Sequence, residues 1–294
     1  MSSPAVATGD LTKQYRETLA LDAVSLSVRR GSVYGLVGPN GAGKTTLLGI
    51  LSGLRRQTAG TFSVDAARIG VLSDTPSFDS WLTAHEVVDL SRSLNAPDTE
   101  DAAVDHVLHL TGLSDVARRK VGGFSRGMLQ RLGLAAAVVG EPDVLLLDEP
   151  AAALDPAGRR EVLDMITALR GTSTVVFSSH ILDDVQQVCD TVGILKAGQI
   201  VYEGTLAELV RNTGHDAAYH VRIRGSGDGL VGVLRSCEWT TGVELDGDVI
   251  TVSASSAPVL ERELMRCLGR ADVPIVSVAP IERSLEDVFL EVTQ

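Results

Sequence analysis

A glycine-rich loop with a lysine and a threonine is the feature of this sequence best suited to chemistry. An apolar run, Val33–Val37, precedes the loop, and a helical pattern opens after it at Thr46. Glycines let successive backbone N–H groups turn inward around phosphate oxygens, and a helix N-terminus adds the positive end of its dipole. We predict that the loop binds a nucleotide, with Lys44 reaching the β- and γ-phosphates and the Thr45 hydroxyl ligating Mg²⁺. The loop residues are Gly38, Pro39, Asn40, Gly41, Ala42, Gly43, Lys44 and Thr45.

Two adjacent carboxylates form a second group of this kind. Asp148 and Glu149 directly follow four apolar residues, Val144–Leu147. Such a run indicates a strand buried on both faces, which delivers the two carboxylates to one end of a sheet. We predict that Asp148 binds the Mg²⁺ and that Glu149 polarises the water molecule that attacks the γ-phosphate.

The pattern around these residues is that of an α/β domain with a mostly parallel sheet. Strand-like runs alternate with helical patterns from Leu21 to about Gly204, as in chains with crossover connections between parallel strands. Thr174–Phe177 is another continuous apolar run and predicts a second buried strand. Strand signals vanish over residues 76–140, which predicts a helical subdomain inserted in the α/β core.

Local signals predict the helices of this inserted region. Thr83 and Glu86 have the spacing of a capping box and predict the start of one helix. Helical patterning continues over Asp101–Thr111 and Ser125–Val139. Trp81 stands at the start of the region, and we interpret it as a packing residue rather than as a contact for a membrane partner.

Short polar turns predict two hairpins in the α/β domain. The first joins Ser25–Val28 to Val33–Val37 through four residues that include a glycine. The second joins Val192–Leu195 to Ile200–Tyr202 in the same way. Both predictions rest on short apolar runs on either side of a turn signal.

A polar segment, Asn212 to Asp216, marks a change in composition and predicts a linker. We therefore predict one domain at 1–213 and a small α+β accessory domain at 214–294. Its βαββαβ order is that of a ferredoxin-like split βαβ unit, and a last short helix is expected at Ser284–Val292. The other expected elements are a strand at Tyr219–Arg224, a helix at Gly229–Ser236, a hairpin of Val243–Leu245 with Val249–Val252, a helix at Pro258–Leu268 and a strand at Ile275–Ala279.

A third motif carries a family resemblance. The segment Phe124-Ser125-Arg126-Gly127-Met128, followed by Gln130 and Arg131, resembles the signature loop of ABC ATPases. With the phosphate loop and the paired carboxylates, the resemblance extends from Leu11 to Gly204, and every motif stands in the family order. It implies a P-loop NTPase fold and an ATPase that uses ATP with Mg²⁺.

The resemblance also implies roles for single residues. Tyr15 matches the aromatic residue that stacks on adenine, Ala153-Leu154-Asp155 looks like the D-loop, and His180 like the switch histidine that contacts the γ-phosphate. Ser125 stands at a helix start, where unpaired N–H groups and the helix dipole favour anions. In this family the phosphate bound by that loop belongs to the opposite subunit, so the resemblance implies a homodimer with two composite sites.

The chain departs from the family pattern in two places. Arg126 replaces the usual first glycine of the signature loop, and Met128 replaces the usual glutamine. Asp74, after Ile69–Ser73, stands where a glutamine is expected. Its carboxylate has the chemistry to bind Mg²⁺ directly or through water, and it also adds negative charge near the phosphates.

Composition and charge limit the kinds of partner and cell compartment that we expect. The 294 residues carry a formal net charge of −12, and nucleic-acid-binding proteins usually show a basic face, so we expect no nucleic acid. Three cysteines without a CxxC pair suit a reducing compartment. The first residues, Met1 to Asp10, predict no signal peptide. Together with these observations, the resemblance implies a cytoplasmic protein that contacts the inner face of the membrane only through a separate permease.

Three functions remain to be weighed. The first is an ATPase subunit that drives an ABC exporter, favoured by the tail Ser284–Phe289, which resembles the ending of bacterial drug- and polymer-export subunits. The second is an ABC ATPase that acts on a macromolecular complex without transport. The third, an ATP-dependent regulator or P-loop kinase, leaves the signature loop and His180 unexplained.

Overall fold

Strand β3 (Val33–Val37) lies inside a six-stranded sheet with the order β5-β6-β7-β3-β8-β9. The structure is a computed structural model and describes residues 3–212 and 217–281. The first five strands in that order are parallel, and β9 pairs with β8 in the antiparallel sense. The other strands are β5 (Ile69–Leu72), β6 (Val144–Leu147), β7 (Thr174–Ser179), β8 (Thr191–Lys196) and β9 (Gln199–Gly204).

The middle of this sheet is apolar on both faces. Every residue of β3, β6 and β7 is buried, as expected for parallel strands covered on both sides. The carboxyl ends of β3, β5, β6 and β7 meet at one edge, which is where ligands bind in open parallel sheets. The fold therefore brings the four segments that follow these strands together.

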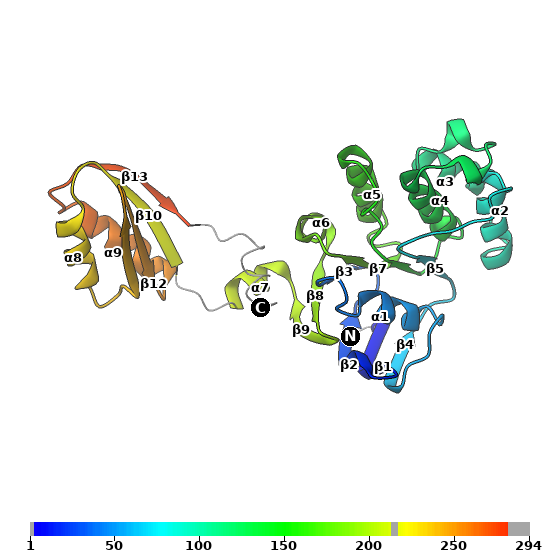
Figure 1. Cartoon of the computed structure of the whole chain (residues 1–294), viewed down its shortest axis with the longest axis horizontal. Coiled ribbons are helices and arrows are strands. Elements are labelled where there is room, and N and C mark those ends of the chain that lie inside the picture. The colour runs from blue at the N-terminus through cyan, green and yellow to red at the C-terminus, as the bar shows by residue number, and fades with distance from the viewer. Residues whose placement is uncertain (1–2, 213–216, 282–294) are drawn as a thin grey trace. The chain divides into compact units, whose positions relative to one another are not determined.

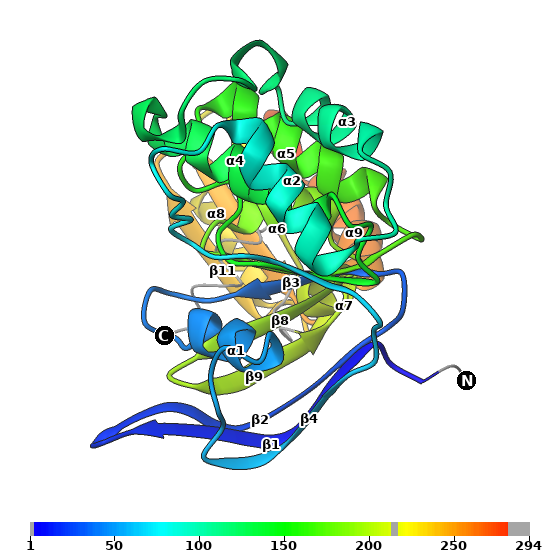
Figure 2. The ribbon, with the colours of Figure 1, turned by 90° about the vertical axis from the view of Figure 1, so that its right-hand side faces the viewer.

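A second sheet is separated from the first by one helix, which packs against both. It is antiparallel with the order β2-β1-β4 and consists of β1 (Val6–Tyr15), β2 (Thr18–Val28) and β4 (Ala59–Val64). Figure 2 shows helix α1 (Lys44–Leu51) between the two sheets. Their facing side chains form one buried cluster with those of α1, including Leu26, Leu36 and Leu47. Ala42 of the phosphate loop belongs to the same cluster, so the loop is anchored in the core.

The predicted hairpin of Ser25–Val28 with Val33–Val37 is wrong. The first segment belongs to β2 and pairs with β1, whereas β3 pairs with β7 and β8 in the other sheet. All five residues of β3 are buried, so this strand is stabilised by neighbours on both sides rather than by an edge partner. The second predicted hairpin is confirmed, because β8 and β9 pair in the antiparallel sense.

Helices follow one another between β5 and β6 (Figure 1). They are α2 (Ala84–Asn95), α3 (Ala102–Leu110) and α4 (Arg126–Val138), with 3-10 turns at Ser114–Val116 and Val121–Gly123. The capping box is confirmed: Thr83 Oγ1 accepts from the Glu86 N–H, and Glu86 Oε2 accepts from the Thr83 N–H. The interpretation of Trp81 as a packing residue is wrong, because Trp81 is 65% exposed.

Three further helices follow β6, β7 and β9 in turn. They are α5 (Pro156–Ala168), α6 (Leu182–Val188) and α7 (Leu206–Asn212). Over residues 3–212 and 217–281, no helix is both long and apolar enough to cross a bilayer.

The chain divides into two compact units, the first ending at Leu209 and the second beginning at Val210. In the second unit the strands form an antiparallel sheet of order β11-β12-β10-β13, the arrangement of a split βαβ unit. Leu230 of α8 and Leu260 of α9 pack on one face of it. The elements are β10 (Ala217–Ile223), α8 (Asp228–Arg235), β11 (Gly242–Asp246), β12 (Val249–Ala254), α9 (Ala257–Leu268) and β13 (Ile275–Pro280).

The turn between β11 and β12 forms as its sequence predicts. Gly247 has φ of 59°, a left-handed conformation that glycine adopts without steric cost, and the two strands pair in the antiparallel sense. The last predicted helix, Ser284–Val292, lies outside the described residues, as does the tail motif Ser284–Phe289.

Candidate active site

The phosphate loop occupies the bend between β3 and α1. Gly43 has φ of 112° and stands at the N-cap of α1, a conformation that residues with a Cβ rarely adopt. A Cβ at Gly43 would lie 2.5 Å from the backbone oxygen of Ala20, and one at Gly38 would overlap the backbone oxygen of Leu195. The loop therefore needs glycines here, and it sets backbone N–H groups at a helix N-terminus where an anion binds well.

Lys44 follows the loop, and its side chain folds back over it. Its ammonium donates to the Gly38 carbonyl at 2.7 Å and to the Pro39 carbonyl at 3.3 Å. Lys44 is only 6% exposed, and its Nζ lies 3.5 Å from Glu149 Oε1. A buried cation is stable only with such partners, and a phosphate oxygen at this point would be one more acceptor.

Asp148 and Glu149 stand directly after β6, as predicted, and face different partners. Asp148 is 4% exposed, and its Oδ1 accepts from the Ser178 hydroxyl at 2.6 Å. The Glu149 carboxylate, 13% exposed, contacts Lys44 through Oε1. The two side chains are thus held apart, which suits one to a metal ion and the other to a water molecule.

His180 follows β7 and contacts the same carboxylate. Its Nδ1 lies 2.8 Å from Glu149 Oε2. A carboxylate only accepts hydrogen bonds, so in this arrangement Nδ1 carries the proton and Nε2 remains for a ligand. His180 is 43% exposed, so its ring is accessible to a ligand. Three loops from three strands therefore place Lys44, Glu149 and His180 in one connected group.

A cavity of about 600 Å³ opens beside this group, within the range of small-molecule sites. The sequence prediction missed Thr18, Leu19, Ala20 and Ala152, which also line it. Predicted residues in its wall are Asn40, Gly41, Ala42, Gly43, Lys44, Thr45, Thr46, Asp74, Arg126, Glu149 and His180. Predicted residues outside its wall are Tyr15, Gly38, Pro39, Ser125, Gly127, Met128, Asp148 and Asp155.

Tyr15 has protein partners of its own. The Lys13 ammonium lies 4.7 Å from the centre of the Tyr15 ring, a cation–π contact, and Arg55 Nη1 donates to the Tyr15 hydroxyl at 2.9 Å. Leu19, on the other side of the same turn, is 45% exposed and lines the cavity. The apolar surface that this turn offers inside the cavity is therefore Leu19, while Tyr15 lies beyond its wall.

The signature segment begins helix α4. The Ser125 hydroxyl accepts from the Met128 N–H at 3.2 Å and so caps the helix. A Cβ added at Gly127 would lie 3.3 Å from Leu154 Cδ2 and 3.4 Å from the Ala153 carbonyl oxygen, so the signature loop and the D-loop segment of one chain are neighbours. Arg126, by contrast, lines the cavity of its own chain.

Asp155 has a similar capping role at the next helix. Its carboxylate Oδ1 accepts from the Gly158 N–H at 3.1 Å, at the N-terminus of α5. An acidic N-cap also interacts well with the helix dipole. The D-loop is therefore fixed at its C-terminal end.

The acidic residues of the site can hold part of a Mg²⁺ coordination shell. Asp74 lines the cavity with Thr45 and Glu149, and the buried Asp148 stands at the same sheet edge. Among residues 3–212 and 217–281, no three His, Cys, Asp or Glu side chains gather as a complete metal site. This donor set fits Mg²⁺, which commonly takes one or two carboxylates and completes its shell with phosphates and water.

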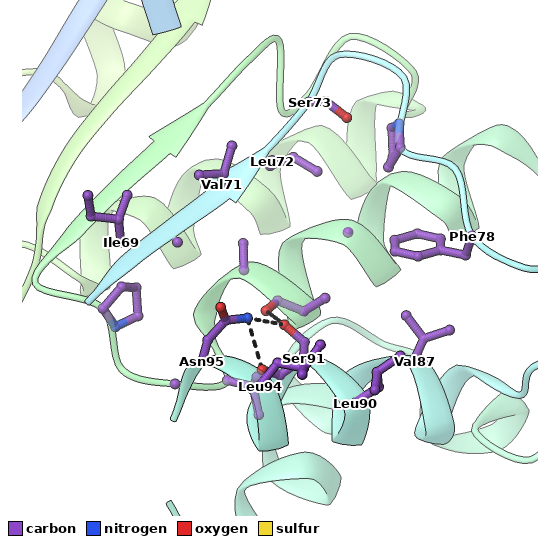
Figure 3. A pocket seen from close by; sticks show the side chains of 18 of the residues that line it. Ile69, Val71, Leu72, Ser73, Phe78, Val87, Leu90, Ser91, Leu94 and Asn95 are labelled. Carbon is purple, nitrogen blue, oxygen red and sulfur yellow. Dashed lines mark hydrogen bonds between the residues drawn. The ribbon is translucent and has the colours of Figure 1, made fainter. Parts of the chain in front are cut away.

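A second cavity, of about 660 Å³, lies between β5 and α2 (Figure 3). We call it the α2 groove. Leu90 and Leu94 of α2 are 50% and 73% exposed, and Val71 of β5 is 39% exposed. Asn95 Nδ2 donates to the Ser91 carbonyl within the helix at 3.0 Å, and the Ser91 hydroxyl donates to the Ala136 carbonyl of α4 at 2.7 Å. The groove is lined by Ile69, Val71, Leu72, Ser73, Phe78, Val87, Leu90, Ser91, Leu94 and Asn95, among others.

The sequence is similar to a large protein family. Residues 21–152 match the profile of the ABC transporter family. The chain is 44% identical to the uncharacterized ABC transporter ATP-binding protein YxlF of Bacillus subtilis over 68% of this chain and 70% of that protein. It is 35% identical to the daunorubicin resistance ATP-binding protein DrrA3 of Streptomyces coeruleorubidus, over 100% of this chain and 97% of the relative.

The fold is similar to that of solved proteins as well. One is the ATP-binding subunit of an ABC transporter, which superposes with a TM-score of 0.65 at 26% sequence identity. The match covers 71% of this chain and 93% of that one. Together with the sequence matches, this shows that the chain has the fold of an ABC ATPase cassette.

Proposed function

The chain belongs to the family of ABC transporter ATP-binding proteins, and we propose that this ATPase drives export through a separate membrane-spanning permease. The observation that carries the proposal is the convergence of Lys44, Glu149 and His180 beside a cavity of about 600 Å³. A cation, a carboxylate and an imidazole in contact supply the charge neutralisation and proton transfer that phosphoanhydride hydrolysis needs.

The phosphate loop and Lys44 bind the triphosphate in this proposal. Backbone N–H groups of the loop and the N-terminus of α1 donate to phosphate oxygens, and Lys44 exchanges part of its contact with Glu149 for the β- and γ-phosphates. Thr45, Asp148 and Asp74 would hold Mg²⁺, which offsets phosphate charge when bound. Leu19 covers the apolar face of the base, with Tyr15 beyond it.

Glu149 then acts on the attacking water. Its carboxylate is 13% exposed and already has two charged or polar neighbours, so it is oriented before substrate arrives, which favours catalysis. His180 turns away from Glu149 when it binds the γ-phosphate, because phosphate oxygens only accept hydrogen bonds and the ring N–H that donates to Glu149 is then needed for them. Release of this contact frees Glu149 to accept the proton of the water.

Two copies of the chain would form two composite sites. Ser125 and Gly127 lie outside the wall of their own cavity, and Ser125 presents a helix N-terminus with a hydroxyl. Such an end binds anions, so we assign it to the γ-phosphate in the opposite subunit. ATP then joins the two copies, and hydrolysis separates them.

The α2 groove is our candidate for the permease contact. It is open, and its exposed leucines on α2 have the apolar character of a helix-binding groove. The full-length relative named for daunorubicin resistance supports export as the direction of transport. On this reading the chain works in the cytoplasm, at the inner face of the membrane and bound to the permease.

Complementation between two inactive variants tests the composite site. Lys44→Ala damages the loop half of a site, and Ser125→Glu damages the signature half while keeping an acceptor at the helix N-cap. In a mixed dimer both lesions fall in one site, and the other site is intact. Mixing the two purified variants should therefore restore ATP turnover that neither shows alone.

A mixture of Lys44→Ala with Glu149→Gln is the matched control. These changes lie in the same half, so every site of the mixed dimer carries one lesion and turnover should stay absent. Failure of the first mixture to recover, with both variants folded and able to dimerise, would refute the composite site. Full turnover by Lys44→Ala alone would refute the phosphate site itself.

A further inference from the structure

The backbone of Glu149 is held in an unfavourable conformation. Its φ is 49°, in the left-handed region that few non-glycine residues occupy. Such strain persists only where the surroundings impose it, and it is concentrated at functional sites. The contacts that impose it therefore decide where the Glu149 carboxylate points.

One of these contacts comes from β7. The Glu149 N–H donates to Ser178 Oγ at 2.9 Å, and the same hydroxyl donates to Asp148 Oδ1 at 2.6 Å. Ser178 is fully buried, so water does not compete for these bonds. The Ser178 hydroxyl thus holds the Asp148 carboxylate and also the Glu149 N–H, which lies on the N-terminal side of the strained φ angle of Glu149.

A second contact comes from α4, outside the core sheet. Gln130 Nε2 donates to the Glu149 carbonyl at 3.2 Å, and that carbonyl also accepts from the Ala152 N–H at 3.2 Å within the turn. Gln130 is 1% exposed. Its amide is therefore the contact that ties the signature helix to the backbone of Glu149.

Gln130 is poorly explained by packing alone. Within the described residues, its Oε1 is buried and has no hydrogen-bond donor. An unpaired buried acceptor costs stability, and an apolar side chain of the same size would avoid that cost. The feature of Gln130 that such a side chain cannot replace is its N–H group directed at the Glu149 carbonyl.

We propose that Gln130 is a positioning residue that holds Glu149 in its strained backbone conformation and so aims its carboxylate at the attacking water. The inference rests on the proposed function, in which Glu149 is the general base. Gln130 does not line the cavity, so it acts through Glu149 and not on the substrate. Because α4 begins at the signature loop, the same contact links the seating of that loop to the geometry of the base.

The test compares Gln130→Met, which keeps the size of the side chain and removes the donor, with Gln130→Glu, which places an acceptor against the carbonyl. Both should lower kcat by about 10- to 100-fold, because small displacements of a catalytic group have effects of that size. The KM for ATP should stay within about threefold, since the contact is not made to the substrate. Gln186→Met, a change of the same type at an exposed position of α6, should alter neither constant.

A double-mutant cycle separates positioning from a structural role. In the Glu149→Gln background, Gln130→Met should cause no further loss of turnover, because it acts only through Glu149. A further 10-fold loss there, an unchanged kcat in the single variants, or loss of folding in both of them would each overturn the inference. If instead Glu149→Gln itself keeps full turnover, the proposed function fails, which is a different outcome.

Discussion

Lys44 Nζ lies 3.5 Å from Glu149 Oε1, and the two side chains are only 6% and 13% exposed. The cation expected to hold the phosphates is thus already paired with the carboxylate expected to activate water. Opposite charges in a poorly hydrated site interact strongly, so phosphates and Glu149 compete for the same ammonium. This relationship determines what each single substitution should do.

Glu149→Gln should separate binding from hydrolysis. The change removes a negative charge beside the phosphates, so ATP affinity should be kept or increased, while turnover falls by about 10²- to 10⁴-fold with the loss of the general base. Binding of labelled ATP and phosphate release measure the two effects. Light scattering with ATP should show a dimer of this variant, and a monomer under those conditions would contradict the composite site.

Lys44→Ala should weaken ATP binding itself. Hydrogen bonds to charged groups contribute about 1.5–3 kcal/mol, which corresponds to roughly 10- to 100-fold in affinity. Equilibrium binding of ATP measures this directly. Lys120→Ala, at an exposed position outside the site, is the control and should bind as the unaltered protein does; equal affinity of both variants would exclude Lys44 from the phosphate site.

Charged residues introduced in the α2 groove should weaken attachment to the membrane without changing ATP turnover. Leu90→Glu and Leu94→Glu place a carboxylate on surface that is 50% and 73% exposed, so the fold should tolerate them, but an apolar partner helix should not. We expect unchanged turnover by the isolated subunit and a smaller fraction sedimenting with membranes from the source cell. Leu54→Glu, 76% exposed and outside the groove, should sediment normally. Equal sedimentation of all three would remove the groove from the permease contact.

The capping box should make the stability of α2 depend on pH. The backbone N–H and hydroxyl of Thr83 hold the pKa of Glu86 below its usual value. A carboxyl whose pKa is lowered by folding stabilises the folded state above its ordinary pKa of about 4.3, and this contribution is lost as pH falls through the lower, folded-state value.

Glu86→Gln should therefore lower the Tm at pH 7, and the difference from the unaltered protein should shrink as pH falls below about 4.3. Thermal unfolding followed by circular dichroism measures this. Glu17→Gln, in the exposed β1–β2 turn, is the control and should leave the Tm unchanged. A difference that stays constant over this pH range would mean that Glu86 does not act through its charge.

Residues 1–214 should fold without the rest of the chain. The central sheet, the helical region and the whole candidate site lie before Leu209, and the second unit has a hydrophobic cluster of its own. The shortened chain should keep a cooperative thermal transition and bind ATP. If it is insoluble or unfolded, the predicted domain boundary is wrong.

The amino-acid sequence alone was sufficient for features whose parts are close together along the chain. The loop from Gly38 to Thr45, the carboxylates after Val144–Leu147 and the capping box of Thr83 with Glu86 each depend on one strand, turn or helix start. Local backbone geometry limits which residues can occupy such positions, so residue types at short spacing identify them.

Only the tertiary structure decided which of these parts meet. The hairpin predicted for Val33–Val37 failed because burial on both faces favours β7 and β8 as neighbours, a preference that no short segment reveals. The contact of His180 with Glu149 and the donor of Gln130 on the Glu149 carbonyl arise because three distant segments pack at one sheet edge. Periodicity predicts that Gln130 lies on a helix, but the partner of a buried amide depends on how that helix packs against the sheet.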